Sequence, residues 1–383
     1  MLVNALALHR AADAARVFLE NLIRGLPEVW PEARIVVIAR RHAEIPNGDR
    51  VDVVRIGSSS SGALRVLDEM IRLPRVIRRL APDVIINPNE SVPRGVRGPL
   101  VVVAQNLFFH CPEIGPNRRG PAHVRLRSRL QFAFYRWRMP RAYARADAVI
   151  PVSAHAAHEL SERAGLDLAR VHVVHYGADR LSVRVRSEPS GPRRLLVVGA
   201  IAHYKRLEYA VRAVAILQAE GREYELLLAG VAWPGEEAFI RSVAASCAVV
   251  DRIKFLGTVD ADELSSLFAT SHAGISLSAC ESFGIPVVEG MRAGLPHVVA
   301  DEPWSAETVA DCAIRVDARD PVAIAAGIRR LEDPAEWRRM VDLGRSRAAR
   351  YTWQANVEGI AAVAARVVQQ HSMRSGHAAG GSA

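Results

Sequence analysis

The fold and the site of this chain are decided by one stretch, Ser278-Ala-Cys-Glu281-Ser-Phe-Gly284-Ile-Pro286-Val-Val-Glu289-Gly-Met-Arg-Ala-Gly294-Leu-Pro296. Apolar runs on both sides of it predict two buried strands, joined by a loop and a helix. Pro286 suits the first turn of that helix, where its missing N–H removes no hydrogen bond. The loop 281–284 is therefore expected at the carboxyl end of a strand, above free helix amides. Ligands of open α/β sheets bind there, and such amides attract phosphate. Glu289, about one turn into the helix, is placed to hold a diol such as a ribose.

Within this stretch, Glu281-Ser-Phe-Gly-x-Pro-x-x-Glu289 resembles the E-x7-E pattern of family 4 of the retaining glycosyltransferases, which have the GT-B fold. The resemblance implies that Glu289 holds the hydroxyls of the nucleotide ribose. It also implies that the loop of Glu281, Ser282, Phe283 and Gly284 holds the donor sugar and diphosphate. The alternative interpretation is a strand, a turn and an amphipathic helix with two incidental surface glutamates.

Length and composition indicate a two-domain α/β protein. The chain has 383 residues, too many for one ordinary core, and 50% of them are hydrophobic. No stretch reaches the roughly 18–20 uninterrupted apolar residues of a membrane span. The N-terminus lacks the basic start of a signal peptide and is expected to form a first strand. These features predict a cytoplasmic protein.

The net charge and the cysteines indicate which partners and which cysteine chemistry to expect. A net charge of +9 allows nucleic acid, anionic membrane or phosphorylated ligands as partners. The chain has no zinc finger and no RNA-recognition motif, so no nucleic-acid partner is expected. The four cysteines, Cys111, Cys247, Cys280 and Cys312, show neither metal nor disulfide spacing and are expected to be reduced thiols in packed positions.

Apolar runs alternate with amphipathic helices along the chain, as in parallel sheets covered on both faces. In the first half, strands are expected at 2–7, 34–39, 51–56, 84–87, 100–105, 148–152 and 171–175, with helices at 14–25, 61–80 and 155–164. A linker rich in Pro, Ser, Gly and charge follows at 181–192. The second half has expected strands at 194–199, 224–230, 253–257, 273–278 and 296–300, and helices at 207–218, 236–248, 261–270, 321–331, 334–350 and 354–370. The predicted domains are 1–182 and 193–360, followed by a helix end and a disordered tail at 361–383.

Two such domains, with the donor motif in the second, match the GT-B arrangement. The resemblance implies two Rossmann-like, doubly wound domains that face a central cleft, the first binding the acceptor and the second the nucleotide-sugar. It is strongest from about residue 145 to residue 360. In the family the final helices cross back to the N-terminal domain, which here would begin near Arg345.

A second motif, Val197-Val-Gly199-Ala-Ile-Ala-His-Tyr-Lys205-Arg206, predicts a strand, a loop and a helix start. It resembles the family's diphosphate-binding loop. The resemblance implies that Lys205, near Gly199, neutralises the diphosphate as the glycosidic bond breaks. The family usually has an arginine directly after the glycine, where this chain has Ala200, and Arg206 is the hypothesised substitute. The alternative is a solvated Lys–Arg pair that opens a helix.

Neither a metal nor a cofactor is expected, because Lys205, Arg206 and helix amides can carry the diphosphate charge. Asp260-Ala-Asp262 looks like a metal-binding Asp-x-Asp pattern, but it directly precedes a helical pattern and is better explained as a helix cap.

The acceptor side departs from the family. Gln105-Asn106 stands where many relatives have His-Asp, and residues 11–15 stand where many have a Gly-Gly loop. Asn106 and His110 are the acceptor-side candidates; the alternative is that His110 is only packed or solvated.

The segment 118–145 carries Leu126, Leu130, Phe134 and Trp137 at helical spacing, with arginines between them. Such a helix either buries its apolar stripe in the core or lies on an anionic membrane surface. Membrane contact, on the inner face of the plasma membrane, would suit a polyprenyl-linked acceptor.

These features predict a metal-independent retaining glycosyltransferase, a hexosyltransferase with Lys205 and Glu281 as catalytic residues. It would move a sugar from a GDP- or UDP-sugar to a glycan or lipid-linked acceptor in bacterial surface polysaccharide synthesis, such as lipopolysaccharide assembly. The His-Tyr-Lys-Arg loop resembles mannosyltransferases, which makes GDP-mannose the first donor hypothesis.

Two alternatives stay open. The first is a catalytically degenerate subunit that binds a nucleotide-sugar or a partner transferase, which Ala200 and Gln105-Asn106 favour. The second is a GT-B-fold epimerase of UDP-sugars, against which the full E-x7-E pattern argues.

Overall fold

The structure is a computed structural model that describes residues 1–6, 14–46, 48, 50–57, 68–88, 92, 95–96, 98–181 and 193–380. The predicted linker at 181–192 lies outside these residues except for Leu181. Most of the unusual loop at 11–15 and the first part of the predicted helix 61–80 also lie outside them.

The first sheet has six parallel strands in the order β3-β2-β1-β4-β5-β6. The strands are β1 (Leu2–Asn4), β2 (Ile35–Arg40), β3 (Val51–Ile56), β4 (Ile85–Asn87), β5 (Leu100–Ala104) and β6 (Ala148–Pro151). The accompanying helices are α1 (Ala14–Val29), a short π-helical stretch (Asp68–Arg72), α3 (Leu73–Leu80), α4 (Ala122–Arg145), α5 (Ala154–Ala164) and α13 (Trp353–Gly380). Every residue of β4 and β5 is buried, which explains their nearly continuous Val, Ile and Leu.

The strand predicted at 171–175 is wrong. This segment follows the edge of β6, where the amides of His172 and Val174 donate to Val149 and Pro151. Only Val171 forms a β-bridge there, so the segment is not a regular strand.

The second sheet repeats the topology of the first, with the order β12-β11-β10-β7-β8-β9, again all parallel. Its strands are β7 (Arg193–Val198), β8 (Tyr224–Ala229), β9 (Ile253–Gly257), β10 (Ala273–Ser276), β11 (His297–Ala300) and β12 (Ile314–Val316). Its helices are α6 (Leu207–Ala219), α7 (Glu236–Ser246), α8 (Ala261–Thr270), α9 (Ile285–Arg292), α10 (Pro303–Thr308), α11 (Pro321–Arg330) and α12 (Pro334–Ala348). Both sheets have the doubly wound order, in which ligands bind at the carboxyl ends of the strands.

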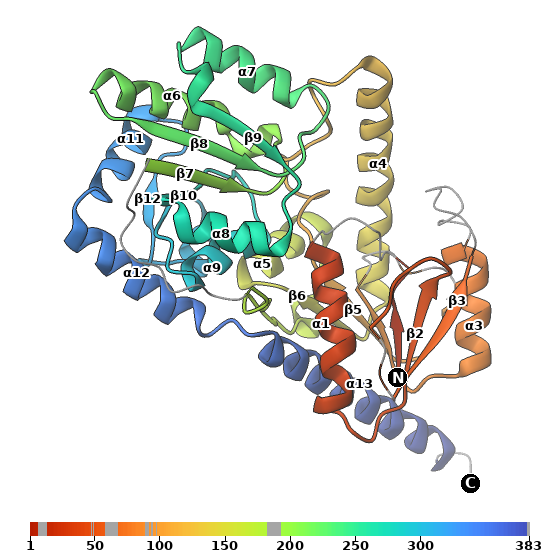
Figure 1. Ribbon diagram of the computed structural model, residues 1–383. Helices are drawn as coiled ribbons and strands as arrows, with labels where there is room; N and C mark the ends of the chain where they lie inside the picture. Colours follow the sequence, from red (N-terminus) through yellow and green to blue (C-terminus); the bar gives the residue numbers. More distant parts are fainter. Residues whose placement is uncertain are drawn as a thin grey trace. The chain divides into compact units, whose positions relative to one another are not determined.

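Alternate residues of β7 point to opposite faces of this sheet. Leu195 and Val197 join a core cluster with α6, α7 and α11, whereas Leu196 joins a second cluster with α8. Figure 1 shows these helices covering the two faces of the sheet. Asp260 caps α8 as predicted, because its carboxylate accepts hydrogen bonds from the amides of Asp262 and Glu263.

The chain folds into two compact units. Unit 1 comprises Met1–Asn106, Phe134–Gly177 and Trp353–Ala383; unit 2 comprises Leu107–Ala133 and Ala178–Thr352. The chain therefore enters unit 2 twice, which the predicted boundaries at 182 and 193 do not describe. The tail predicted to be disordered is helical as far as Gly380, in keeping with the helix-favouring Ala378 and Ala379.

Helix α13 completes unit 1 by packing against α1, β5 and β6. The ring of Trp353 lies beside the rings of Phe18 and Tyr176, at centroid distances of 6.4 and 5.9 Å. Gly177 permits this approach, because a Cβ there would lie 2.3 Å from the Trp353 amide nitrogen. None of the described helices is both long enough and apolar enough to cross a membrane.

Candidate functional site

The two predicted catalytic residues meet in unit 2. Lys205 ends a 3₁₀ turn that follows β7, and Glu281 lies in the loop that follows β10, the neighbouring strand. Lys205 Nζ donates a hydrogen bond to Glu281 Oε1, and the two side chains are 13% and 19% exposed. The same loops are also joined through the backbone, since the Ala279 amide donates to the Tyr204 carbonyl at 2.9 Å. The sheet order therefore brings together two motifs that lie 76 residues apart in sequence.

Lys205 remains a cation at neutral pH. Burial alone would lower its pKa, but attraction to the Glu281 carboxylate, to Tyr204 and the hydrogen bond to Glu281 together raise the pKa above its usual value. A fixed, partly dehydrated ammonium of this kind can stabilise a leaving group on which negative charge develops.

Glycine is required where β7 and β8 end. Gly230, with φ of 149°, runs so close to Gly199 that a Cβ on Gly230 would lie 1.9 Å from the Gly199 carbonyl oxygen. A Cβ on Gly199 would lie 3.6 Å from Lys205 Nζ, so Gly199 leaves the space beside the ammonium clear. The structure thus brings Gly199 next to Lys205.

The loop before α9 is held on several sides. Gly284 adopts φ of 87° at the helix start, and a Cβ there would meet Trp304 Cζ3 at 3.1 Å. The Phe283 carbonyl accepts a hydrogen bond from Thr308 Oγ1 at 2.8 Å, and the Phe283 ring is buried. Ser282 Oγ accepts a hydrogen bond from the Leu107 amide at 3.1 Å. These contacts fix the backbone amides of the loop at the end of β10.

Glu289 is a buried acid in α9. Only 7% of the residue is exposed, and Oε1 lies 3.8 Å from Arg180 Nε. Burial raises the pKa of Glu289 to about 7, although the Arg180 charge opposes the shift. Arg180 was not among the predicted site residues, because nothing in its local sequence indicates that it faces α9.

His297 is a second residue that sequence reasoning missed. With Lys205, Glu281 and Gly284, it lines a small cavity of about 20 Å³. Burial lowers the pKa of His297 to about 4, despite a contact of 2.9 Å between Nδ1 and the Leu295 carbonyl, so the ring is neutral. The ring packs against Gly274 and Gly290, where a Cβ would approach within 2.3 and 2.4 Å. Its position directly after Pro296, at the end of the motif that holds Glu281 and Glu289, was the available signal.

Arg206 is not brought into the Lys205–Glu281 cavity. It has a left-handed backbone with φ of 53° at the start of α6, and its guanidinium donates to Glu302 Oε1 at 2.7 Å. Arg206 lines a separate pocket, together with Tyr204.

The two acceptor-side candidates belong to different units. Asn106 is exposed at the end of the first segment of unit 1, whereas His110 is buried in unit 2.

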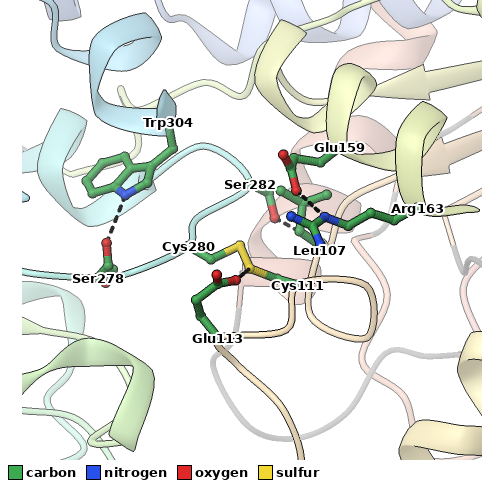
Figure 2. Close-up of a disulfide and its surroundings, with 9 residues drawn as sticks. All are labelled: Leu107, Cys111, Glu113, Glu159, Arg163, Ser278, Cys280, Ser282 and Trp304. Carbon is green, nitrogen blue, oxygen red and sulfur yellow. Dashed lines mark hydrogen bonds and ion pairs between the residues drawn. A yellow bond between two sulfur atoms is a disulfide. The ribbon is translucent and has the colours of Figure 1, made fainter. Parts of the chain in front are cut away.

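The segment Leu107–Ala133 is fastened to unit 2. A disulfide joins Cys111 to Cys280, the residue before Glu281, and Figure 2 shows it near Ser282 and Trp304. Asn117 Nδ2 donates to the Pro234 carbonyl at 3.1 Å, and Arg119 Nη1 donates to Glu236 Oε2 at 2.7 Å.

The disulfide corrects the expectation of four reduced thiols. Cys111 and Cys280 are 169 residues apart, so no local sequence pattern indicates that they pair. The fold alone brings their Cα atoms to a distance of 6.7 Å. Cys247 and Cys312 are free.

Comparison with known families covers most of the chain. Residues 180–346 match the model described as glycosyl transferases group 1, and residues 15–180 match the model described as glycosyltransferase family 4.

Two curated relatives illustrate the similarity. The D-inositol 3-phosphate glycosyltransferase of Salinispora tropica is 28% identical over 60% of this chain and 53% of its own length. The GDP-mannose:cellobiosyl-diphosphopolyprenol alpha-mannosyltransferase of Komagataeibacter xylinus is 28% identical over 52% of this chain and 51% of its own length. The match thus spans about half the length of each of these relatives.

Among solved structures, WaaG, a glycosyltransferase involved in lipopolysaccharide biosynthesis, superposes with a TM-score of 0.70 at 13% identity, over 95% of this chain and 99% of WaaG. At this identity the likeness concerns the fold alone, and it confirms the predicted GT-B fold.

Proposed function

Because the chain belongs to family 4 of the glycosyltransferases, the group 1 enzymes, we propose that it is a metal-independent retaining glycosyltransferase. The observation that carries the proposal is the Lys205–Glu281 pair at the carboxyl ends of β7 and β10. A nucleotide-sugar donor would bind in unit 2, where these ends and the start of α9 meet.

The proposed reaction follows from the charges at this site. The bond between the sugar C1 and the diphosphate oxygen breaks, and its electron pair leaves with the diphosphate, beside the Lys205 ammonium. The acceptor oxygen bonds to C1 on the same face, and its proton passes to a phosphate oxygen. Glu281 positions the sugar, the fixed amides of Phe283 and Gly284 contact the diphosphate, and Glu289 holds the ribose.

GDP-mannose is the proposed donor, with a UDP-sugar as the alternative. The His203-Tyr204-Lys205-Arg206 loop and the similarity to the GDP-mannose-dependent enzyme of Komagataeibacter xylinus support this choice. The name of that relative also supports a glycan on a polyprenyl diphosphate as the acceptor, within surface polysaccharide synthesis.

Peripheral membrane contact through α4 is part of the proposal. Leu126, Leu130 and Trp137 are 59%, 64% and 50% exposed, so the stripe is not buried in the core. Arg125, Arg127 and Arg129 are exposed beside it. Exposed apolar residues interleaved with arginines suit an anionic bilayer surface.

The membrane step is tested by sedimentation with phosphatidylglycerol-containing liposomes. The protein is expected to sediment, and Leu126→Ser with Trp137→Ser is expected to remain in the supernatant. Failure of the unaltered protein to sediment would remove membrane contact from the proposal.

The donor is tested by thermal shift and slow hydrolysis with GDP-mannose, UDP-glucose, UDP-GlcNAc, UDP-galactose and the free nucleotides. We expect a shift with one nucleotide family, and its loss in Glu289→Ala. The absence of a shift with every donor would contradict the proposal.

A nucleotide-sugar-binding subunit without activity is the second candidate. It is favoured by one observation: Arg206 faces Glu302 and so does not replace the cation missing at Ala200. Donor binding without turnover, with every acceptor offered, would support this candidate, and turnover that Lys205→Ala abolishes would exclude it.

A further inference from the structure

A second pocket, of about 440 Å³, lies within unit 2. Two stretches form most of its wall, within residues 112–119 and within the loop and helix start at 203–209, and Ala279 and Arg319 complete it. The contacts that fasten Leu107–Ala133 to unit 2 hold the first stretch in place. Its volume falls in the range of small-ligand sites, about 300–1,000 Å³.

The charges of the wall balance. Arg119 is paired with Glu236, and Arg206 with Glu302, both at 2.7 Å. Within the described part of the chain, the guanidinium groups of Arg118 and Arg319 have no carboxylate partner, and the wall sets Glu113 and Glu208 against them. A phosphate would therefore meet two carboxylates, and a bare cation would meet two guanidinium groups, so neither kind of ion is favoured.

The wall suits hydroxyl groups instead. Guanidinium groups only donate hydrogen bonds and carboxylates only accept them, whereas each sugar hydroxyl does both. A polyol can therefore satisfy Arg118, Arg319, Glu113 and Glu208 together.

His203 supplies an independent indication of a ligand. Its side chain is 7% exposed and lines the pocket, and neither ring nitrogen has a hydrogen-bond partner among the described residues. Nδ1 lies 3.7 Å from Glu236 Oε1, within ion-pair distance, so among the residues that the structure describes the ring nitrogen left without a partner is Nε2. A buried polar group without a partner is costly, and a ligand hydroxyl would remove that cost.

Two tyrosines, Tyr204 and Tyr209, complete the wall. Aromatic side chains combine an apolar ring with a polar end, and the faces of a sugar ring present C–H groups that pack against such rings. The pocket also adjoins the reacting groups in sequence, because Tyr204 precedes Lys205 and Ala279 lies two residues before Glu281.

We propose that this pocket binds the sugar residues at the end of the acceptor glycan. The proposal rests on the proposed transferase function. It adds a binding site for the acceptor in unit 2, whereas the sequence predicted acceptor binding by the N-terminal domain. The sugar of the donor carries hydroxyl groups like those of the acceptor glycan. The test must therefore distinguish binding of the donor sugar from binding of the acceptor.

Binding is tested first without any nucleotide, by saturation-transfer NMR with methyl α-D-mannopyranoside, cellobiose and N-acetylglucosamine. We expect at least one of these sugars to bind, and its Kd to rise at least tenfold in the double variant Glu208→Gln with Arg319→Gln. The matched control is Glu223→Gln with Arg330→Gln, which alters exposed residues of the same unit. No binding of any sugar, an effect no larger than in the control, or displacement of the sugar by 10 mM inorganic phosphate would overturn the proposal.

Kinetics then separate acceptor from donor. In the double variant we expect the KM for the acceptor to rise at least tenfold, and the KM for the donor in hydrolysis to rise less than twofold. A rise in the donor KM alone would assign the pocket to the donor sugar and overturn the proposal. If the unaltered protein binds sugars as expected but turns over no donor, the transferase function fails, and the pocket is a sugar-binding site that serves no acceptor.

Discussion

At the scale of single residues, the proposed function depends on Lys205 and Glu281, which form an ion pair. Replacing Lys205 by Ala is expected to lower kcat for donor turnover by about 100- to 1,000-fold, because it removes the cation beside the leaving diphosphate. Lys254→Ala is the matched control, since Lys254 is the only other lysine and is exposed in β9.

Steady-state kinetics on both variants check this prediction, with thermal unfolding to confirm that each one folds. An increase in KM at unchanged kcat for Lys205→Ala would show that the lysine binds the donor without stabilising the transition state.

Glu289 gives the stability of the protein a pH dependence. Its pKa is about 7 in the folded chain against 4.5 for an ordinary glutamate. Between these values the folded protein holds a proton that the unfolded chain has lost, so stability falls as the pH rises through this window. Above pH 7 the cost is on the order of 3 kcal/mol.

Glu289→Gln should remove this cost. We expect the free energy of unfolding of the variant, relative to the unaltered protein, to increase by about 1–3 kcal/mol between pH 5 and pH 8. Denaturant titrations at both pH values measure the difference. A difference that does not change with pH would contradict the raised pKa.

The sequence motifs predicted that Lys205, Gly199, Glu281 and the loop to Gly284 lie at strand ends, and the structure places them there, because strand, turn and helix start follow from the local sequence. They did not identify His297 or Arg180, whose roles depend on which elements pack together. The placement of Arg206 was also beyond the local pattern, since its partner Glu302 lies 96 residues away.

At the scale of elements, the segment Leu107–Ala133 depends on its attachment to unit 2. Cys111→Ser should lower the free energy of unfolding by about 2–4 kcal/mol, the usual contribution of a native disulfide. Hydrogen exchange should become faster at residues 107–120 and 278–284, which the disulfide joins.

Hydrogen exchange by mass spectrometry checks this, with Cys312→Ser as the control because Cys312 is a free buried cysteine. Equal exchange of both loops in Cys111→Ser and in the unaltered protein would mean that the remaining hydrogen bonds suffice to hold the segment.

Several elements were predicted well from periodicity. The predicted bounds of β3, β9 and α8 match the structure in full. β12 and α10 were not predicted, because three residues are too few to show the period of a strand, and six are too few to show the longer period of a helix. The sequence also did not determine whether the apolar residues of α4, from Leu126 to Trp137, are exposed. The same helical spacing suits a face buried in the core and a face that contacts a membrane.

At the scale of the whole molecule, α13 belongs to unit 1 although it follows unit 2 in the chain. A chain that ends at Thr352 should therefore lose protection from hydrogen exchange in α1, β5 and β6, against which α13 packs. It should keep its nucleotide affinity within about twofold of the full chain, because the truncation leaves every residue of unit 2 in place.

Hydrogen exchange on the truncated chain tests the predicted loss of protection, and nucleotide titration of the same sample tests the predicted affinity. A truncated chain whose α1 exchanges as slowly as in the full chain would show that unit 1 is stable without α13. Loss of nucleotide binding would show that the proposed donor site needs unit 1.

The late position of α13 also determines the order in which the protein can be completed on the ribosome. Unit 2 has all its residues once Thr352 has been synthesised, whereas unit 1 contains segments that emerge earlier and must wait for α13. Until then, apolar residues of α1 such as Phe18 and Leu22 lack the helix that packs against α1. Nascent chains with exposed apolar surface are prone to aggregate. A helix that is synthesised late thus protects a helix that is synthesised early, and a product released before α13 would expose a surface that chaperones bind.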